Sequence, residues 1–437
     1  MFIYYLQLAT KSLRKTLPST VLMVFAIALG IGLSMTALTL NHVRGTNPIP
    51  EKSAQLYSLQ LQASGKSSTW SQSDNMPVQV TYQDAINIMK SNQHLRHTGM
   101  YKTGFAVRSM DPEFAPMLYS ARVTNRHFFA MFNIDFLYGA SWSEEIDLSP
   151  DYQVVISDTL NQKLFGGGDN TGKSIMLDNR TYRIVGITKE WAPAPKFYDL
   201  NNGGFQSAEQ IFIPLSLAPT EEFPSWGNNN GWKDERVTNF QEKMQSETMW
   251  FQYWVELNSP QEKEEFELYL EGYIADQKKL ARFEREDARG VLRNVEQWLE
   301  YLNVEGDDSN VLVGVSFMFL AVCLVNTIGL LLAKFLKSAP EVGVRRALGA
   351  NKEQVFIQHL VEVGMLGLIG GVVGLALANI GLFILRSQFD GFDVIATMDW
   401  KMLAAAPVIA ISATVIAGIY PAWRVCKTLP SVYLKTQ

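Results

Sequence analysis

Residues 167–174 read GGDNTGKS and satisfy the G-x-x-x-x-G-K-[ST] pattern of a phosphate-binding loop. In such a loop the backbone amides and the lysine bind the phosphates of a nucleotide. That geometry requires a buried strand before the glycines and a helix that begins at the lysine. Here the helix-like segment 157–165 (SDTLNQKLF) precedes the glycines, and the hairpin-like segment 175–187 follows the lysine. We therefore predict that the match is incidental, that it forms a turn, and that the chain is not itself an ATPase.

The chain offers little other chemistry. No Ser, His and Asp, and no Cys and His, stand at a spacing typical of nucleophilic catalysis, and the five histidines are scattered. The two cysteines, Cys323 and Cys426, lie in an apolar run and near the C-terminus, so the segment 43–310 contains none. We expect no catalytic residue, no metal site, no disulfide framework and no cofactor.

Four long runs carry no charged residue at all: 21–40, 311–333, 363–385 and 402–423. At about 1.5 Å per residue, each helix of this length crosses the roughly 30 Å hydrocarbon core of a bilayer. The first run is longer than the apolar part of a signal peptide and lacks a clean A-x-A cleavage site, so we expect an uncleaved anchor. The sequence predicts four transmembrane helices.

The basic residues predict the orientation of these helices. Three Lys and Arg precede the first run, five lie between the second and third, and three follow the fourth. The loop between the third and fourth runs holds only Arg386 and Lys401 beside three aspartates. Because cytoplasmic loops are rich in Lys and Arg, we expect both termini in the cytoplasm of a multi-pass inner (plasma) membrane protein.

The segment 43–310 then lies outside the cytoplasm. It carries 25 Lys and Arg against 37 Asp and Glu, which argues against binding to nucleic acid. The expected order is an amphipathic cytoplasmic segment (1–20), a span (21–42), the outer domain (43–310), a span (311–333), a cytoplasmic segment (334–354), a span (355–385), a short outer loop (386–401), a span (402–423) and a tail (424–437).

Strand and helix signals alternate along the outer segment, which indicates an α+β domain. Strands are expected near 54–62, 119–124, 152–157 and 209–215, and a β-hairpin over 174–188 with Asn179–Arg180 at its turn. Short helices are expected after Thr81 and after Asp158, each residue acting as an N-cap, and another at 126–132. The charged segment 259–283 predicts an amphipathic helix with Phe266, Leu270 and Tyr273 on its inner face.

Residues 191–236 are rich in Pro, Gly and Asn and predict long loops. Four tryptophans occur in or after this region: Trp226, Trp232, Trp250 and Trp254. They either line a binding surface or anchor the core and loops.

The cytoplasmic segment contains the motif PEVGVRRALGA. Pro340 and Glu341 suit the first turn of a short helix, and Gly349 suits its end. Such a basic helix between two membrane spans is suited to docking on a partner. Alternatively, its arginines only fix the membrane topology. We expect that role for Lys334 and Lys337. The candidate docking residues are Glu341, Gly343, Arg345, Arg346, Leu348 and Gly349.

Small residues share one face of the third span: Gly367, Gly371, Gly374 and Ala378. Small residues let membrane helices approach closely, within one subunit or across a dimer. His359 and Glu362 lie near the cytoplasmic end of the same span. Ionisable groups there are candidates for function, and we expect snorkelling or bonds to neighbouring loop residues.

Several stretches of the sequence resemble the FtsX/MacB family of ABC transporter permeases. PEVGVRRALGA is similar to the family element E-[IV]-G-[IV]-R-[RK]-A-[LI]-G-A, and the tail AGIYPAWRVCKTLPSVYLK to its C-terminal motif. Residues 123–143 and 154–187 resemble two elements of its MacB-like outer domain, which places Lys173 in a structural turn. Trp142, Cys426 and the segment 191–250 depart from the family pattern.

The resemblance implies a permease whose ATPase is a separate cytoplasmic subunit, with residues 341–349 as the coupling helix. It implies a dimer with a second copy or a related permease, contact with membrane lipid, and mechanical transmission to the outer domain. Efflux of small molecules or peptides with a periplasmic adaptor and an outer-membrane duct is the leading expectation. Lipoprotein release, activation of wall hydrolases and a receptor without transport are the alternatives.

Overall fold

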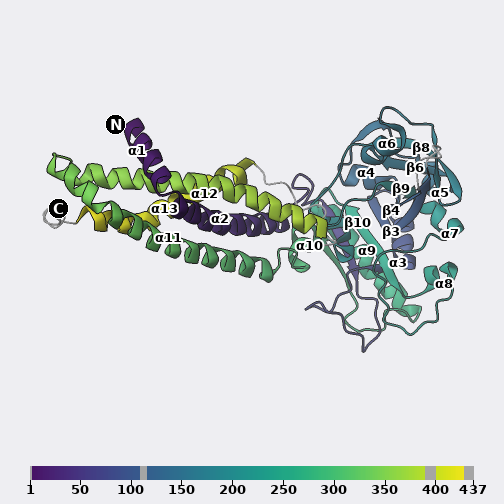
Figure 1. Ribbon diagram of the computed structural model, residues 1–437. Coiled ribbons are helices and arrows are strands. Elements are labelled where there is room, and N and C mark those ends of the chain that lie inside the picture. Colours follow the sequence, from purple (N-terminus) through teal and green to yellow (C-terminus); the bar gives the residue numbers. More distant parts are fainter. Residues whose placement is uncertain (1, 109–115, 389–399, 428–437) are drawn as a thin grey trace. The chain divides into compact units, whose positions relative to one another are not determined.

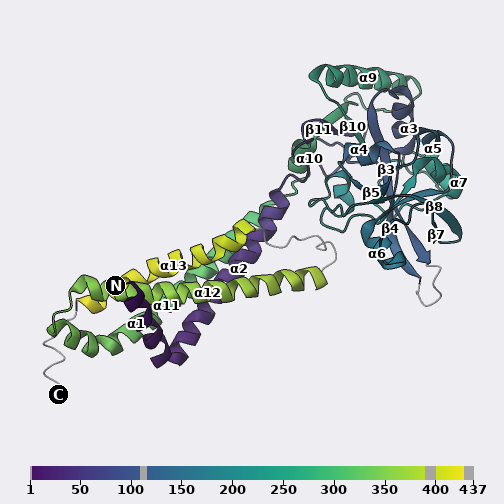
Figure 2. The same cartoon turned by 90° about the horizontal axis from the view of Figure 1, so that it is seen from above.

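The computed structural model describes residues 2–108, 116–388 and 400–427 (Figures 1 and 2). The chain divides into two compact units, which are described separately. One comprises Met1–Gly45 and Glu305–Gln437 and is helical, and the other comprises Thr46–Val304 and contains the sheet.

The helical unit consists of long apolar helices that run side by side (Figure 1). Four are long and apolar enough to cross a membrane, with mean hydropathy between 2.2 and 2.4, as the sequence predicts. A shorter helix, α1, precedes them and packs on α12. The helices are α1 (Phe2–Lys15), α2 (Leu17–Gly45), α11 (Asp307–Ala347), α12 (Lys352–Gln388) and α13 (Trp400–Cys426).

Small residues on α12 bring its neighbours close. A Cβ placed on Gly367 would lie 3.0 Å from the Ala410 carbonyl oxygen on α13, and one on Gly374 would lie 2.9 Å from the Ala28 carbonyl oxygen on α2. Gly371 also faces α13, and Ala378 is fully buried. The close neighbours of the three glycines therefore belong to the same subunit.

The motif PEVGVRRALGA does not form a separate helix, and this part of the sequence prediction is wrong. Helix α11 continues through Pro340 to Ala347. Proline lacks an N–H and so removes one hydrogen bond from the helix, and the Pro340 ring is exposed. The helix ends at Gly349, whose φ of 104° is easily reached only by glycine. The Ala350 N–H bonds the Arg345 carbonyl and the Gly349 N–H bonds the Arg346 carbonyl, the pattern of a Schellman cap.

The other unit is built on one mixed sheet, so the predicted α+β class is confirmed. Among the described residues eleven strands join it, with the main order β11-β1-β10-β3-β4-β9-β6-β8-β5. Most neighbours are antiparallel, whereas β4 with β9 and β6 with β8 are parallel. The strands are β1 (Leu56–Leu61), β2 (Val80–Thr81), β3 (Arg96–Arg108), β4 (Met117–Thr124), β5 (Phe136–Gly139), β6 (Gln153–Ser157), β7 (Ser174–Leu177), β8 (Arg180–Thr188), β9 (Ile211–Pro214), β10 (Met249–Glu256) and β11 (Gly290–Asn294).

Helices cover both faces of the sheet (Figure 2). The strand β10 alternates between two cores, because Tyr253 and Val255 join one cluster and Trp254 joins the other. The first core includes residues of α3, α6, α8 and α9, and the second includes residues of α4 and α10. The helices are α3 (Tyr82–Ser91), α4 (His127–Met131), α5 (Glu144–Leu148), α6 (Asp158–Phe165), α7 (Ala218–Glu221), α8 (Phe240–Gln245), α9 (Pro260–Lys279), α10 (Val295–Tyr301) and the 3₁₀ turns η1 (Phe197–Asn202) and η2 (Leu215–Leu217).

Two local predictions need correction. The N-cap of α6 is Ser157 rather than Asp158, because the Ser157 hydroxyl accepts the Leu160 N–H at 3.1 Å. The turn between β7 and β8 is Asp178–Asn179, since Leu177 pairs directly with Arg180. Asp178 has a φ of 50°, the left-handed conformation that a two-residue hairpin turn requires. By contrast, Thr81 caps α3 as predicted.

Of the four tryptophans, two lie in the cores, Trp232 is partly buried against the first core, and Trp226 is partly exposed. Trp250 and Trp254 are about 1% exposed and belong to the two cores, so they line no binding surface. Trp226 is 42% exposed, and its ring packs on Gly104 so closely that a Cβ there would lie 2.0 Å from it. Gly104 is therefore required in the middle of β3 for this loop to dock.

A buried charge cluster fastens the long loop before β9 to the sheet. Arg122 on β4 bonds both Asp199 and Glu209, and all three side chains are inaccessible to solvent. Lys196 lies 2.6 Å from Glu209, and Tyr198 donates a hydrogen bond to the same carboxylate at 2.8 Å. Two cations and two carboxylates balance one another, as buried charges must.

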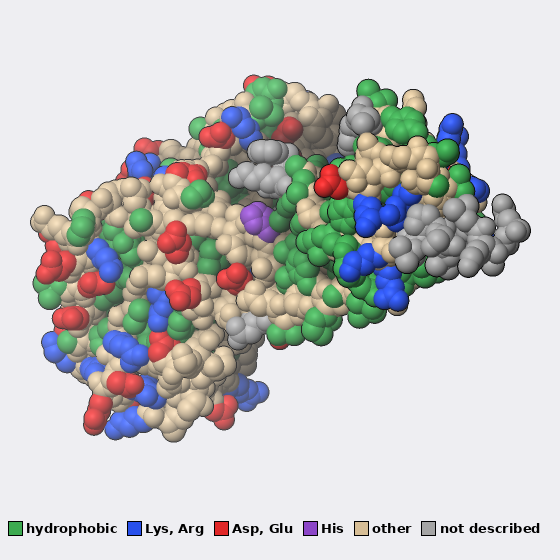
Figure 3. All heavy atoms as spheres, turned by 90° about the vertical axis from the view of Figure 1, so that its left-hand side faces the viewer, with side chains coloured by type: hydrophobic (Ala, Val, Ile, Leu, Met, Phe, Trp, Pro, Cys, Tyr) green, Lys and Arg blue, Asp and Glu red, His purple; other side chains and the backbone are tan. Residues whose placement is uncertain are grey.

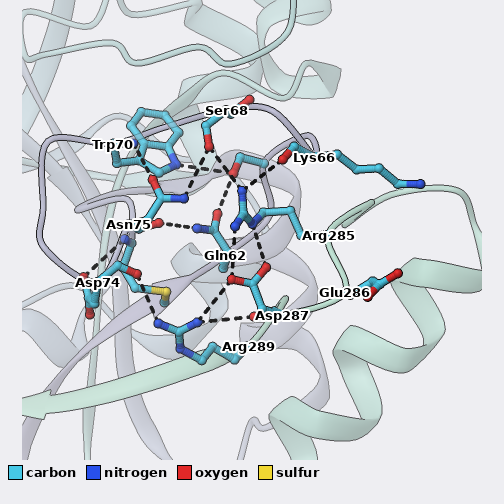
Figure 4. A network of polar contacts seen from close by, with 12 residues as sticks. Gln62, Lys66, Ser68, Trp70, Asp74, Asn75, Arg285, Glu286, Asp287 and Arg289 are labelled. Atoms are coloured by element: carbon cyan, nitrogen blue, oxygen red, sulfur yellow. Dashed lines mark hydrogen bonds and ion pairs between the residues drawn. The ribbon is translucent and has the colours of Figure 1, made fainter.

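A second polar network holds the connection after β1 (Figure 4). Arg285 donates to the Ser68 carbonyl at 3.2 Å and lies 2.8 Å from Asp287. Arg289 donates to the Asp74 carbonyl at 3.1 Å. These contacts hold the segment 285–289 against the loop that follows β1, and their donors and acceptors satisfy one another.

Candidate functional site

The phosphate-loop pattern lies between a helix and a hairpin, as the sequence predicts. Helix α6 precedes it, and β7 begins directly after Lys173. The Asn170 side chain donates to the Gly167 carbonyl at 3.0 Å, and Lys173 donates to the Asn170 side-chain oxygen at 2.6 Å. No helix begins at the lysine in this described segment, so the fold does not direct a helix N-terminus toward a phosphate.

The candidate docking residues lie at the C-terminal end of α11. We call residues 341–349 the coupling segment. Leu348 is 83% exposed at the end of this segment, and Glu341 and Gly349 are also exposed. Arg345 and Arg346 are partly buried, and Gly343 is buried.

Three contacts tie the coupling segment to the other helices of its unit. Glu341 accepts from Arg345 at 2.7 Å and lies 3.7 Å from Lys15 of α1. Arg345 also donates to Gln358 of α12 at 3.3 Å. The segment thus contacts α1 and α12 as well as belonging to its own helix.

The third contact reaches the last helix. Arg346 donates to the Cys426 carbonyl at the end of α13, at 3.2 Å. A guanidinium beside the carbonyls of a helix C-terminus also interacts favourably with the helix dipole. The sequence motif does not reveal this role, because the partner lies 80 residues away and is a backbone atom.

An internal ion pair joins α12 to the part of α11 that precedes the coupling segment. Lys334 of α11 is 2.6 Å from Glu362 of α12, and both side chains are at most 5% exposed. Ser12 of α1 donates to the same carboxylate at 2.7 Å, and the His359 Nδ1 is 3.7 Å from it. The expectation that Lys334 only sets topology is wrong, because it pairs with Glu362 inside the protein. Glu362 neither snorkels nor bonds to loop residues, the two outcomes expected from the sequence, but bonds to Lys334 and Ser12 on two neighbouring helices.

The described residues contain no cluster of three His, Cys, Asp or Glu side chains that could hold a metal ion.

Comparison with known proteins agrees with this architecture. The family model of the MacB-like periplasmic core domain matches residues 20–272, and that of the FtsX-like permease C-terminal region matches residues 313–430.

Several curated relatives are similar over most of this chain. It is 24% identical over 324 residues to the pyoverdine export ATP-binding/permease protein PvdT of Pseudomonas savastanoi pv. phaseolicola, covering 71% of this chain and 42% of that protein. It is 21% identical over 351 residues to the uncharacterized ABC transporter permease YvrN of Bacillus subtilis, covering 80% and 77%. The macrolide export ATP-binding/permease protein MacB of Bdellovibrio bacteriovorus is 21% identical over 67% of this chain and 40% of its own length. The chain thus spans less than half of PvdT and MacB.

Among solved structures, the periplasmic region of MacB from Actinobacillus actinomycetemcomitans aligns with a TM-score of 0.36 and 11% identity, over 58% of this chain and 95% of that one. The extracellular domain of the transporter YknZ from Gram-positive bacteria aligns with a TM-score of 0.34 and 12% identity, over 55% and 100%. Because one family model covers more than half of the chain and a second covers its C-terminal helices, the chain belongs to the FtsX/MacB family of ABC transporter permeases.

Proposed function

We propose that this chain is the permease subunit of an ABC transporter and that a separate cytoplasmic ATPase drives it. ATP binding and hydrolysis would occur on that partner, and the outer unit would move in response. The names of PvdT and MacB describe export of pyoverdine and of macrolides, which supports export of small molecules or peptides as the task. Two copies, or this chain and a related permease, would form the membrane part, with an adaptor and an outer-membrane duct on the far side.

The coupling segment is the observation that carries the proposal. It ends in a glycine-capped helix terminus with an exposed leucine, and it contacts α1, α12 and α13 of its own unit. An exposed apolar side chain at a rigid helix end fits a pocket on a partner protein. A partner can drive motion only if it binds the two states of the permease differently, and a segment in contact with three other helices would transmit that difference.

The orientation belongs to the same proposal. Lys and Arg side chains gather at the end of the helical unit that Figure 3 presents to the viewer. This is the side on which we place the cytoplasm, both termini and the ATPase.

Co-purification from native membranes in mild detergent, with mass spectrometry of what stays bound, tests the proposal. We expect an ABC ATPase to accompany the folded chain and to hydrolyse ATP. If the chain is monodisperse and no ATPase is bound, the transporter assignment fails and a receptor without transport becomes the better explanation.

A further inference from the structure

A cavity of about 450 Å³ opens among α1, α11 and α12. Five basic side chains line it, against two carboxylates: the basic residues are Lys11, Lys15, Lys334, Lys337 and Arg345. Two of these cations are neutralised within the protein. Lys334 pairs with Glu362, and Arg345 pairs with Glu341, which also lies 3.7 Å from Lys15.

Three other side chains of the cavity, Lys11, Lys337 and His359, are less well paired. Neither Lys11 nor Lys337 forms an ion pair with any described residue. His359 is 4% exposed; its Nδ1 lies 3.7 Å from Glu362, beyond hydrogen-bond distance, and its Nε2 has no hydrogen-bond partner among the described residues. A buried, unpartnered imidazole costs free energy unless a ligand or water supplies the missing bond. The cavity therefore combines excess positive charge with an unused hydrogen-bonding group, which suits a phosphate-bearing anion.

Exposed apolar side chains on α1 and α2 indicate that the phosphate group belongs to a lipid. Ile3 and Tyr4 of α1 are 73% and 58% exposed, and Leu17 and Val21 at the start of α2 are 58% and 57% exposed. Exposed apolar side chains of this kind enter the boundary between lipid headgroups and acyl chains. Lys11 of the cavity is on the same helix as Ile3 and Tyr4, and α2 follows that helix directly, so we infer that the cavity lies near the lipid headgroups.

We propose that this cavity binds the headgroup of an anionic phospholipid of the inner leaflet. Lys11 of α1 and Lys337 of α11 would bind the phosphate from two sides, and His359 would supply a hydrogen bond from the cavity wall. Basic pockets between membrane helices on the cytoplasmic side recognise such headgroups. The bound lipid would join α1 to the helix that carries the coupling segment. This inference rests on the orientation given with the proposed function, but lipid binding itself requires neither an ATPase nor a cargo.

Native mass spectrometry of the full-length chain tests the inference. The delipidated protein is titrated with phosphatidylglycerol or with zwitterionic phosphatidylcholine of the same acyl chains. We expect selective retention of phosphatidylglycerol by the natural chain. The double variant K11Q/K337Q should bind it about thirty-fold more weakly, from roughly five-fold for each lysine near an anionic lipid. The variant K11R/K337R, which keeps both charges, should retain binding.

The matched control is K352Q/K427Q, which removes two exposed lysines of the same unit that do not line the cavity. It should bind phosphatidylglycerol like the natural chain. Equal loss in both glutamine variants, or no loss in K11Q/K337Q, overturns the proposal. Displacement of the lipid by millimolar inorganic phosphate also overturns it, because the cavity would then be a site for a soluble phosphate ester.

Discussion

Replacing Gly367 by alanine adds one methyl group to the contact between α12 and α13. A Cβ built on Gly367 lies 2.1 Å from the Thr414 Oγ1 and 3.0 Å from both the Ala410 carbonyl oxygen and the Ile411 Cα. The threonine side chain can rotate away. The two backbone atoms, however, can retreat only if α13 moves, so the substitution must separate two helices of the unit.

Overpacking of this kind costs about 1–3 kcal/mol. Alanine recovers up to about 1 kcal/mol through its higher helix propensity. The net expectation for G367A is a loss of about 1–2 kcal/mol. Gly364 is the matched control on the same helix, because its added Cβ would meet only the Val415 Cγ2, at an ordinary 3.9 Å. G364A should be neutral or slightly stabilising.

The assay is thermal unfolding of the purified full-length chain in detergent, followed by the fraction that remains monodisperse on size-exclusion chromatography. G367A should lose monodispersity at a lower temperature than the natural chain, and G364A should not. The double variant G367A/T414A should recover only part of the loss, since the backbone contacts remain. If G367A and G364A unfold at the same temperature, the close packing of α12 on α13 is refuted.

Three further outcomes follow from the structure. In the same unfolding assay, E362Q should destabilise the chain by about 3–5 kcal/mol because it leaves Lys334 as an unpaired buried charge. The double variant K334M/E362L should destabilise it less, and equal losses of stability in the two variants would contradict the ion pair. Burial lowers the pKa of His97 from 6.5 to about 3, so the unfolded chain binds more protons than the folded chain between these pH values. The free energy of unfolding should therefore fall by about 1.4 kcal/mol per pH unit as the pH decreases through that window. Denaturant unfolding of H97N should show a shallower pH dependence, and an identical slope would contradict this prediction. K173A should leave ATP hydrolysis by the co-purified complex unchanged, and loss of hydrolysis with the complex intact would restore the phosphate-loop interpretation.

Features that depend on local sequence were predictable. The four spans follow from uncharged runs of twenty or more residues, because hydropathy is a property of neighbouring residues. The hairpin that comes after the phosphate-loop pattern was predicted from the alternating residues of β7 and β8, although its turn was predicted one residue too late. Gly349 was placed at the helix end because few other residues adopt its φ of 104°.

Features that depend on contacts distant in the sequence were not predictable. Arg122, Asp199 and Glu209 form one buried cluster, yet in the sequence each looks like an ordinary surface charge. Lys334 looked like a topology marker because its partner Glu362 lies on another helix. In each case the deciding energy is between segments that only the fold brings together.

Replacing Leu348 most directly tests whether the coupling segment binds the ATPase. In the complex with the co-purified ATPase, L348D is compared with L280D, which alters a leucine of the outer unit that is 69% exposed. We expect L348D to weaken the association by at least about 2 kcal/mol, the scale of an apolar interface anchor, and L280D to leave it unchanged. If the folded L348D chain retains the ATPase and its activity, the coupling segment is not the docking site and the account is contradicted.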